Sequence, residues 1–339
     1  MTAPLDVDSA SLQAGTEEVL ESVGGKKIQG RSLSQIAWMR LKRDKVAVAS
    51  GVVIIIILLL AIFGKYVAQL EGKGWNYKDA DSGALNPNNF YFPKGSFGGV
   101  SSQHWFGVEP QQGRDMFARV VYGLRISMIV SLSSTFLTTL IGVVMGVVAG
   151  YFGRTVDNVI SRFMDLLLAF PQLLFLMALT PVVYDRLTHA GLPAGNNTRI
   201  TMLIIIISFF GWPYIGRIVR GQTLSLRERE FVDAARALGA KPSHILFRQI
   251  LPNLWAPILV YATLIIPTYI ALEAALSFLG VGILPPTPSM GNILSGAATF
   301  FATDPSYLFI PGCFLIIVVL VFNLFGDGLR DALDPRSNR

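Results

Sequence analysis

The sequence predicts an all-α integral membrane protein with six transmembrane helices, and three observations lead to this fold class. Hydrophobic residues make up 52% of the 339 residues and charged residues only 15%, whereas soluble domains carry about 25% charged residues. The mean hydropathy is +0.52. The charges are gathered into gaps between six long apolar segments, each of which is suited to cross a bilayer as a helix.

The six apolar segments follow one another along the chain and differ in their interruptions. The third contains Pro171 and Pro181, and the fourth is short, with Pro213 near its end. The fifth holds a single charge, Glu273. Because a spanning helix needs about 20 predominantly apolar residues, the predicted spans are 46–64, 126–153, 166–184, 200–216, 254–280 and 305–326.

Lys and Arg are distributed unequally between the gaps. If the N-terminus is cytoplasmic, the inner gaps hold 19 of the 28 basic residues and the outer gaps hold 9. Because basic residues accumulate on the cytoplasmic side, both termini are predicted to be cytoplasmic. Residues 1–45 are then an N-terminal tail, with an amphipathic segment expected to lie on membrane lipid. Residues 65–125 are an extracytoplasmic segment, which we call the outer segment, and 327–339 are a cytoplasmic C-terminal tail.

One predicted cytoplasmic gap, 217–253, carries a residue pattern typical of two short helices joined by a turn. Gly239 stands where a helix end favours a residue with positive φ, and Pro242 suits the first turn of a second helix. One helical face is predicted from residues spaced three and four apart: Phe231, Ala234, Ala235 and Leu238. Composition leaves two interpretations open, an amphipathic connector on anionic lipid and a docking site for a cytosolic protein.

This gap resembles the EAA loop of binding-protein-dependent ABC importer permeases. In that loop, E-A-A is followed by three residues, Gly, nine residues and I-x-L-P. Asp233 replaces the first Glu and keeps its charge, while Gln249 stands in place of the Ile. The resemblance implies that the loop couples the permease to an ATPase through Asp233, Ala234, Ala235, Arg236, Leu238, Gly239, Leu251 and Pro252.

Three other segments resemble the same family. Residues 106–127 look like its G-R-D…Y-G-x-R-x-S segment, although Val108 and Glu109 replace a Thr-Asp pair. Residues 273–294 and 322–335 match the C-type permease subunit of the dipeptide, oligopeptide and nickel branch. The resemblance covers nearly the whole chain after the N-terminal tail.

The resemblance implies a type I ABC importer permease (MetI-like) fold, with a five-helix core at 126–326. It also implies a division of labour with other subunits. A second, B-type permease completes the solute pathway, two ATPase subunits dock on the EAA loops, and an extracytoplasmic solute-binding protein delivers the solute. Asp233 is expected to pair with a basic residue of the ATPase.

The residues also indicate which chemistry this chain lacks. There is no G-x-x-x-x-G-K-[ST] phosphate loop. The chain is therefore not predicted to be an enzyme or to carry a cofactor, and ATP and Mg²⁺ are expected on the partner ATPase subunits. Cys313 and three widely separated histidines do not predict a metal site. No catalytic residues and no nucleic-acid contacts are predicted.

Two candidate features lie within the predicted spans. Gly142, Gly146 and Gly150 form a stripe that suits close helix packing, or alternatively a contact that shifts during transport. Glu273 is an intramembrane acid, for which structural hydrogen bonding and a role in the solute pathway are both open.

Two more candidates lie at the ends of spans. Arg114 and Asp115 precede the second span, and they either brace the outer segment or contact the binding protein. Asp165 is expected to pair with Arg162 or to cap its helix.

Three classes of function are compatible with a multi-span protein. A secondary carrier should show several paired charges inside its spans and an internal repeat, but the sequence offers Glu273 alone. A membrane-embedded hydrolase needs a convergent His/Asp or Ser/Lys set, and the pattern shows none. An importer permease is therefore predicted, with short peptides as solute and nickel or another small solute as the alternative.

Overall fold

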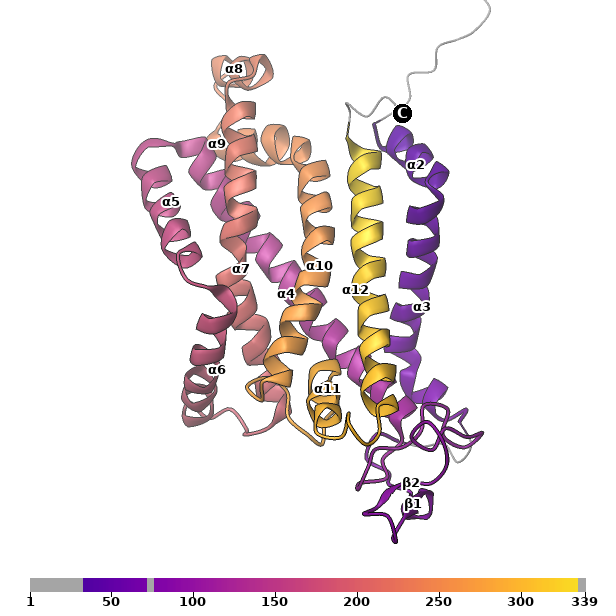
Figure 1. Ribbon diagram of the computed structural model, residues 1–339. Coiled ribbons are helices and arrows are strands. Elements are labelled where there is room, and N and C mark those ends of the chain that lie inside the picture. Colours follow the sequence, from indigo (N-terminus) through magenta and orange to yellow (C-terminus); the bar gives the residue numbers. More distant parts are fainter. Residues whose placement is uncertain (1–32, 72–75, 335–339) are drawn as a thin grey trace, which may run out of the picture.

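A computed structural model describes residues 33–71 and 76–334. These residues form a helical bundle with a small loop-rich segment at one end (Figure 1). Within them, five helices are long and apolar enough to cross a membrane: α3 (Lys45–Ala68), α4 (Met116–Phe152), α7 (Asn196–Arg227), α10 (Trp255–Phe278) and α12 (Ser306–Leu333). A sixth crossing is formed if α5 (Arg154–Leu168) and α6 (Gln172–His189) are taken as one bent span. The predicted number of spans is thus matched.

The third predicted span, 166–184, is broken rather than continuous. α5 and α6 meet at an angle of 89°. Pro171 has no backbone N–H, and it biases Phe170 before it towards extended backbone. In Figure 1, α5 occupies the half of the bundle nearer α8, and α6 occupies the other half.

Four other helices extend beyond their predicted bounds, and the first of them, α3, runs to Ala68 instead of ending at residue 64. α4 begins at Met116 because the Asp115 carboxylate accepts a hydrogen bond from the Ala118 amide at 2.7 Å and caps the helix. α7 continues through Pro213 to Arg227, so part of the predicted 217–253 loop is helical. α12 likewise continues to Leu333, into the predicted C-terminal tail.

The most extensive helix contact in the bundle joins α4 to α7. Gly142, Gly146 and Gly150 lie on the face of α4 that meets α7. A Cβ atom at these three glycines would lie 2.6–2.9 Å from the carbonyl oxygens of Trp212, Gly216 and Arg220, respectively. The two backbones are therefore in direct contact, which only residues without a side chain allow.

The N-terminal helices pack on the other side of the bundle, against α12. α2 (Leu33–Arg43) corresponds to the predicted amphipathic segment, and its Arg40 guanidinium donates to the Asp334 carbonyl at 2.7 Å. Asp44 caps α3 by accepting from two backbone amides. In Figure 1, α2, α8 and the end of α12 all lie at the same end of the bundle. The predicted tails themselves, 1–32 and 335–339, lie outside the described residues.

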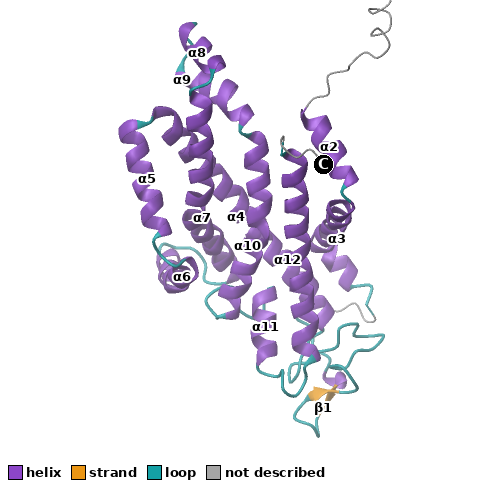
Figure 2. Cartoon of the chain, turned by 45° about the horizontal axis from the view of Figure 1, so that its top comes forward, coloured by secondary structure: helices purple, strands orange, loops and turns teal. Residues whose placement is uncertain are grey.

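Loops gather at the opposite end, as Figure 2 shows. The outer segment there holds a 3₁₀ turn, η1 (Ser82–Ala84), and two short antiparallel strands, β1 (Leu85–Asn86) and β2 (Phe92–Pro93). A short helix that the sequence did not predict, α11 (Met290–Ala298), lies between α10 and α12. Its capping box at Ser289 satisfies the first backbone amides.

Replacing Gly146 by Ala should destabilise the protein, because the new methyl group would lie 2.6 Å from the Gly216 carbonyl oxygen. Overpacking of this kind costs about 1–3 kcal/mol. Gly221→Ala is the matched control, since Gly221 is helical on α7 and has open space around it. The midpoint of thermal unfolding in detergent should fall for Gly146→Ala and stay level or rise for Gly221→Ala. Equal midpoints would contradict the backbone contact.

Candidate functional site

The predicted coupling loop projects from one end of the bundle as two short helices (Figure 1). α7 runs to Arg227, and α8 (Glu230–Ala237) follows almost at once. The chain then turns into α9 (Pro242–His244), a π-helical turn (η2, Ile245–Ile250) and a 3₁₀ turn (η3, Leu251–Asn253) before α10 begins. We call the residues from 228 to 254 the coupling loop. The predicted helix–turn–helix is present, but it starts later than 217 because α7 is longer.

The inner side of α8 packs on the second half of the coupling loop. Val232 and Ala235 are buried, and they share one apolar cluster with Ile245, Ile250 and Leu254. This cluster continues into the side chains of α7. The loop is therefore attached to the bundle by apolar packing rather than by its two chain ends alone.

The outward face of α8 differs from the predicted face in one residue. Phe231, Ala234 and Leu238 are exposed, and Leu238 is 88% exposed. Ala235 instead points inward, and the buried partner that the sequence pattern missed is Val232. The i, i+3 spacing of an apolar residue and Ala would have revealed this inner face.

Gly239 ends α8 in a left-handed conformation, with φ of +76°. The Gly239 amide donates to the Arg236 carbonyl at 2.9 Å, and the Ala240 amide donates to the Ala235 carbonyl at 3.0 Å. These are the two bonds of a Schellman motif. A Cβ at Gly239 would meet nothing within 4 Å, so backbone conformation rather than space makes glycine necessary here.

The exposed charges of α8 are only loosely held. Asp233 is paired with Arg236 at 3.2 Å, but the side chain of Asp233 is 64% exposed. Surface pairs of this kind contribute about 0–1 kcal/mol, so Asp233 can exchange its partner at little cost. Leu251 is half-buried and Pro252 is exposed where the chain returns to α10.

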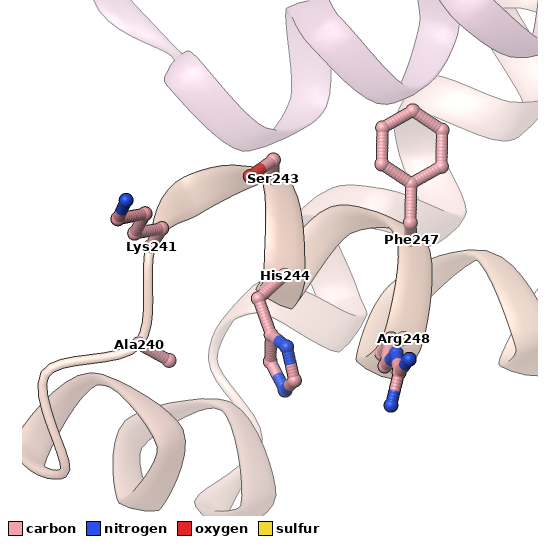
Figure 3. Close-up of a pocket in the computed structure, with 6 residues that line it drawn as sticks. All are labelled: Ala240, Lys241, Ser243, His244, Phe247 and Arg248. Atoms are coloured by element: carbon pink, nitrogen blue, oxygen red, sulfur yellow. The ribbon is translucent and has the colours of Figure 1, made fainter.

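A shallow hollow of about 510 Å³ lies on the coupling loop beside α8 (Figure 3). In Figure 3, Lys241 and Ser243 lie at the start of α9, and Phe247 and Arg248 follow on the next turn. Its lining is basic and apolar at once: Ala240, Lys241, Ser243, His244, Phe247 and Arg248. Such a surface suits a protein partner that offers acidic and apolar groups.

Glu273 is fully buried and joins three helices. Its carboxylate accepts from Ser127 of α4 at 2.5 Å and from Ser277 of its own helix at 2.7 Å. The Ser127 hydroxyl also accepts from the Met290 amide at the start of α11, at 3.4 Å. These contacts agree with the first of the two roles considered for Glu273, which is hydrogen bonding that holds helices together. A role in the solute pathway stays a prediction.

Asp165 does not pair with Arg162 as the sequence suggested. Its carboxylate accepts from Arg217 of α7 at 2.8 Å. A second pair, Asp157 with Arg220, also joins α5 to α7, and both guanidinium nitrogens Nε and Nη2 take part. No local pattern indicates either pair, because the partners are more than 50 residues apart along the chain.

Comparisons with known proteins identify the family. The model of the binding-protein-dependent transport system inner membrane component matches residues 142–339, which include the whole coupling loop. The chain belongs to this family. A second model, the N-terminal transmembrane domain of oligopeptide transport permease C, matches residues 32–88. The permease is thus a multi-pass inner-membrane protein, and its family is a family of transport proteins.

The permease is similar over most of its length to named relatives. It is 38% identical to the dipeptide transport system permease protein DppC of Alkalihalophilus pseudofirmus, over 88% of this chain and 89% of that protein. It is 37% identical to the oligopeptide transport system permease protein OppC of Bacillus subtilis, over 93% and 94%. It is 37% identical to the glutathione transport system permease protein GsiD of Escherichia coli, over 88% and 89%.

A solved structure supports the fold. The permease matches a chain of the MetNI methionine ABC transporter in an inward-facing conformation, with a TM-score of 0.51 and 21% sequence identity. The match covers 65% of this chain and 98% of that chain. The predicted type I ABC importer permease fold is thereby confirmed.

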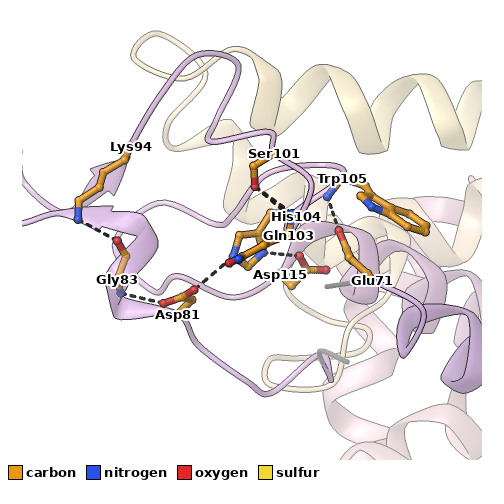
Figure 4. Close-up of polar contacts among 9 residues, drawn as sticks. All are labelled: Glu71, Asp81, Gly83, Lys94, Ser101, Gln103, His104, Trp105 and Asp115. Carbon is orange, nitrogen blue, oxygen red and sulfur yellow. Dashed lines mark hydrogen bonds and ion pairs between the residues drawn. The ribbon is translucent and has the colours of Figure 1, made fainter. Parts of the chain in front are cut away.

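Arg114 and Asp115 are held inside the outer segment of the permease. Arg114 pairs with Glu109 at 2.5 Å, and Glu109 also accepts from the Tyr307 hydroxyl of α12 at 2.7 Å. Asp115 is fully buried, and its carboxylate contacts His104 Nδ1 at 2.8 Å (Figure 4). Both side chains brace the segment, and their contact with a binding protein stays a prediction.

Glu71 lies at the point where the outer segment leaves α3. Its carboxylate accepts from the Trp105 amide, and it is buried close to Asp115 (Figure 4). Burial, together with the neighbouring Asp115 charge, raises the pKa of Glu71 to about 8, although the hydrogen bond from the Trp105 amide opposes the rise. Near neutral pH this carboxyl is therefore mostly protonated in the folded segment.

Raising the pH from about 6 to about 9 should loosen the outer segment. The folded segment holds a proton on Glu71 that the unfolded segment loses above its ordinary pKa, so stability falls as the pH rises towards the folded pKa of about 8. Hydrogen exchange of the Trp105 region, corrected for the intrinsic pH dependence of exchange, should show decreasing protection. Glu71→Gln, which stays neutral, should remove this decrease. An unchanged pH dependence in that variant would contradict the assignment.

Proposed function

We propose that this permease forms half of the translocation pathway of an ATP-driven importer of short peptides. A second, B-type permease supplies the other half, and cytosolic ATPase subunits, which bind ATP and Mg²⁺, dock on the coupling loop. The observation that carries the proposal is the outward face of α8, with Leu238, Ala234 and Asp233 exposed on a helix that is packed firmly against the bundle.

The geometry of the coupling loop supports a mechanical role. A force on the outward face of α8 passes through Val232 and Ala235 to the apolar cluster shared with α7. α7 in turn lies backbone to backbone on α4. Because packed helices move as rigid bodies rather than deforming, closure of the ATPase would tilt α7 and α4 together. ATP and solute then bias the same two-state element, which is what coupling requires.

The proposed orientation places the α8 end of the bundle in the cytoplasm. The excess of Lys and Arg in the predicted inner gaps supports this choice. The outer segment with β1 and β2 then faces the extracytoplasmic side, where a solute-binding protein delivers its load. α2 and the end of α12, the described helices at the two ends of the chain, both lie at this α8 end of the bundle (Figure 1).

Short peptides are proposed as the solute because the relatives in the comparison are named for dipeptide, oligopeptide and glutathione transport. Their shared similarity extends over nearly the whole chain. The pathway itself lies between two different permeases, so the contacts that select one peptide depend on both chains.

Gly239→Val and Asp233→Lys should each reduce recovery of the ATPase subunits with the tagged permease. The valine disfavours φ of +76° and distorts the end of α8, and the lysine reverses a charge on its exposed face. The tagged permease is expressed together with its neighbouring genes, extracted in mild detergent and purified. The measurement is the molar ratio of ATPase subunits to permease in the purified sample. We expect a loss of about tenfold or more for the charge reversal, as for other truncated or reversed interface charges.

Two matched controls lie at the opposite end of the bundle. Gly191 has φ of +100° and open space around it, so Gly191→Val tests backbone strain without touching the coupling loop. Asp185 is also well exposed, so Asp185→Lys tests charge reversal. Both should keep the ATPase. Recovery of the wild-type permease alone or as a homodimer, with no ATPase, would refute the proposed function.

A further inference from the structure

A hollow of about 830 Å³ opens at the end of the bundle that carries β1 and β2. One wall comes from the outer segment and the other from the start of α12, with Pro305, Ser306 and Phe309. The remaining lining residues of the hollow include Phe92, Phe97, Gly98 and Asp304.

Asp304 lies at the floor of the hollow with half of its carboxylate unsatisfied. The residue is 8% exposed. Ser306 donates to Oδ1, but Oδ2 has no hydrogen-bond partner among the residues that the structure describes. The backbone of Gly98 lies over this oxygen, since a Cβ at Gly98 would be 3.0 Å from Oδ2. A buried carboxylate oxygen without a partner is costly, so the site favours a cationic group.

The rim of the hollow is aromatic and strained. Phe97 is 79% exposed and has φ of +51°, and Phe90 and Tyr91 on the same loop also have positive φ. Across the hollow, Phe309 is 66% exposed. Bulky side chains rarely adopt positive φ, and exposed aromatic rings gain nothing from packing within this chain. Strain of this kind is found where a surface is held ready for a partner.

We propose that this hollow receives a Lys or Arg side chain of the extracytoplasmic solute-binding protein. The cationic group would bond Asp304 Oδ2 once the Gly98 backbone moves aside, and the aliphatic stem would lie against Phe97 and Phe309. An aromatic rim strengthens such a contact through the attraction between a cation and a ring. The inference rests on the proposed function, because it assigns the docking point of that partner.

Two observations support a basic side chain of a soluble protein as the occupant: the basic groups of this surface, and the place of the outer segment relative to the helices. Lys94, which lies three residues before Phe97, is already engaged, since its ammonium donates to the Gly83 carbonyl at 2.8 Å. Residues 281–304 contain no Lys or Arg. The outer segment stands beyond the helix ends (Figure 1), which favours a protein outside the membrane over a lipid headgroup as the occupant.

The test measures binding of the purified solute-binding protein to the whole transporter in lipid nanodiscs, with Asp304→Asn as the main variant. Asparagine keeps the size of the side chain and removes the charge. We expect the Kd to rise by about tenfold or more, because a buried charge pair loses one partner, and the salt dependence of binding to weaken. Phe97→Ala, which leaves Asp304 in place, should also raise the Kd.

Asp185→Asn is the matched control, since Asp185 is exposed on α6 at the same end but on the other side of the bundle. It should leave the Kd unchanged. If the Kd is unaltered in both Asp304→Asn and Phe97→Ala, the proposal for this hollow is overturned. Binding of the solute-binding protein to the wild-type transporter would in that case still uphold the proposed function. Loss of the second permease from the Asp304→Asn complex would also overturn the proposal for this hollow, by making that subunit the occupant. Failure of the wild-type transporter to bind any solute-binding protein would refute the proposed function itself.

Discussion

The contact between the backbones of α4 and α7 is the constraint on which the rest of this molecule depends. Lipid surrounds the helices with groups as apolar as their own side chains, so the hydrophobic effect does little to hold them together. The glycine stripe at 142, 146 and 150 replaces it with close van der Waals contact between the end of α4 and the part of α7 from Trp212 to Thr223. Since α7 leads directly into α8, the position of the coupling loop relative to the core follows from this one interface.

Buried polar groups add the cross-links that apolar packing cannot supply. Glu273 ties α4, α10 and α11 together, and Thr138 of α4 bonds Tyr269 of α10 at 3.0 Å. Each group is costly to bury alone, and its cost is offset only when every helix takes one register. These contacts therefore select a single arrangement of helices that look much alike in composition.

The two ends of the bundle present different chemistry. At the α8 end, charged side chains such as Asp233 are exposed and weakly paired. At the β1 end, Glu109 and Asp115 are buried in a network that braces the outer segment, and the exposed groups include the aromatic rings of Phe90, Tyr91 and Phe97. A permease that must contact one partner in the cytoplasm and another outside would need such a difference, because each partner then recognises one end only.

Span length, loop charge and the glycine-ended α8 could all be read from the order of residues, because each depends on near neighbours. Helix periodicity, the need of about 20 apolar residues per crossing and the positive φ at Gly239 are local properties. Even so, local signals misplaced the start of the coupling loop, since Pro213 does not end α7, and they did not predict the sharp bend before Pro171.

The order of residues was enough to predict the fold class, the family resemblance and a helical loop between α7 and α10. The tertiary structure decided which residues face inward and which side chains meet. It placed Val232 and Ala235 against the core, paired Asp165 with Arg217, and left Asp304 with an unsatisfied oxygen. These outcomes depend on atoms far apart in the chain, whose approach is set by helix packing and not by the residues beside them.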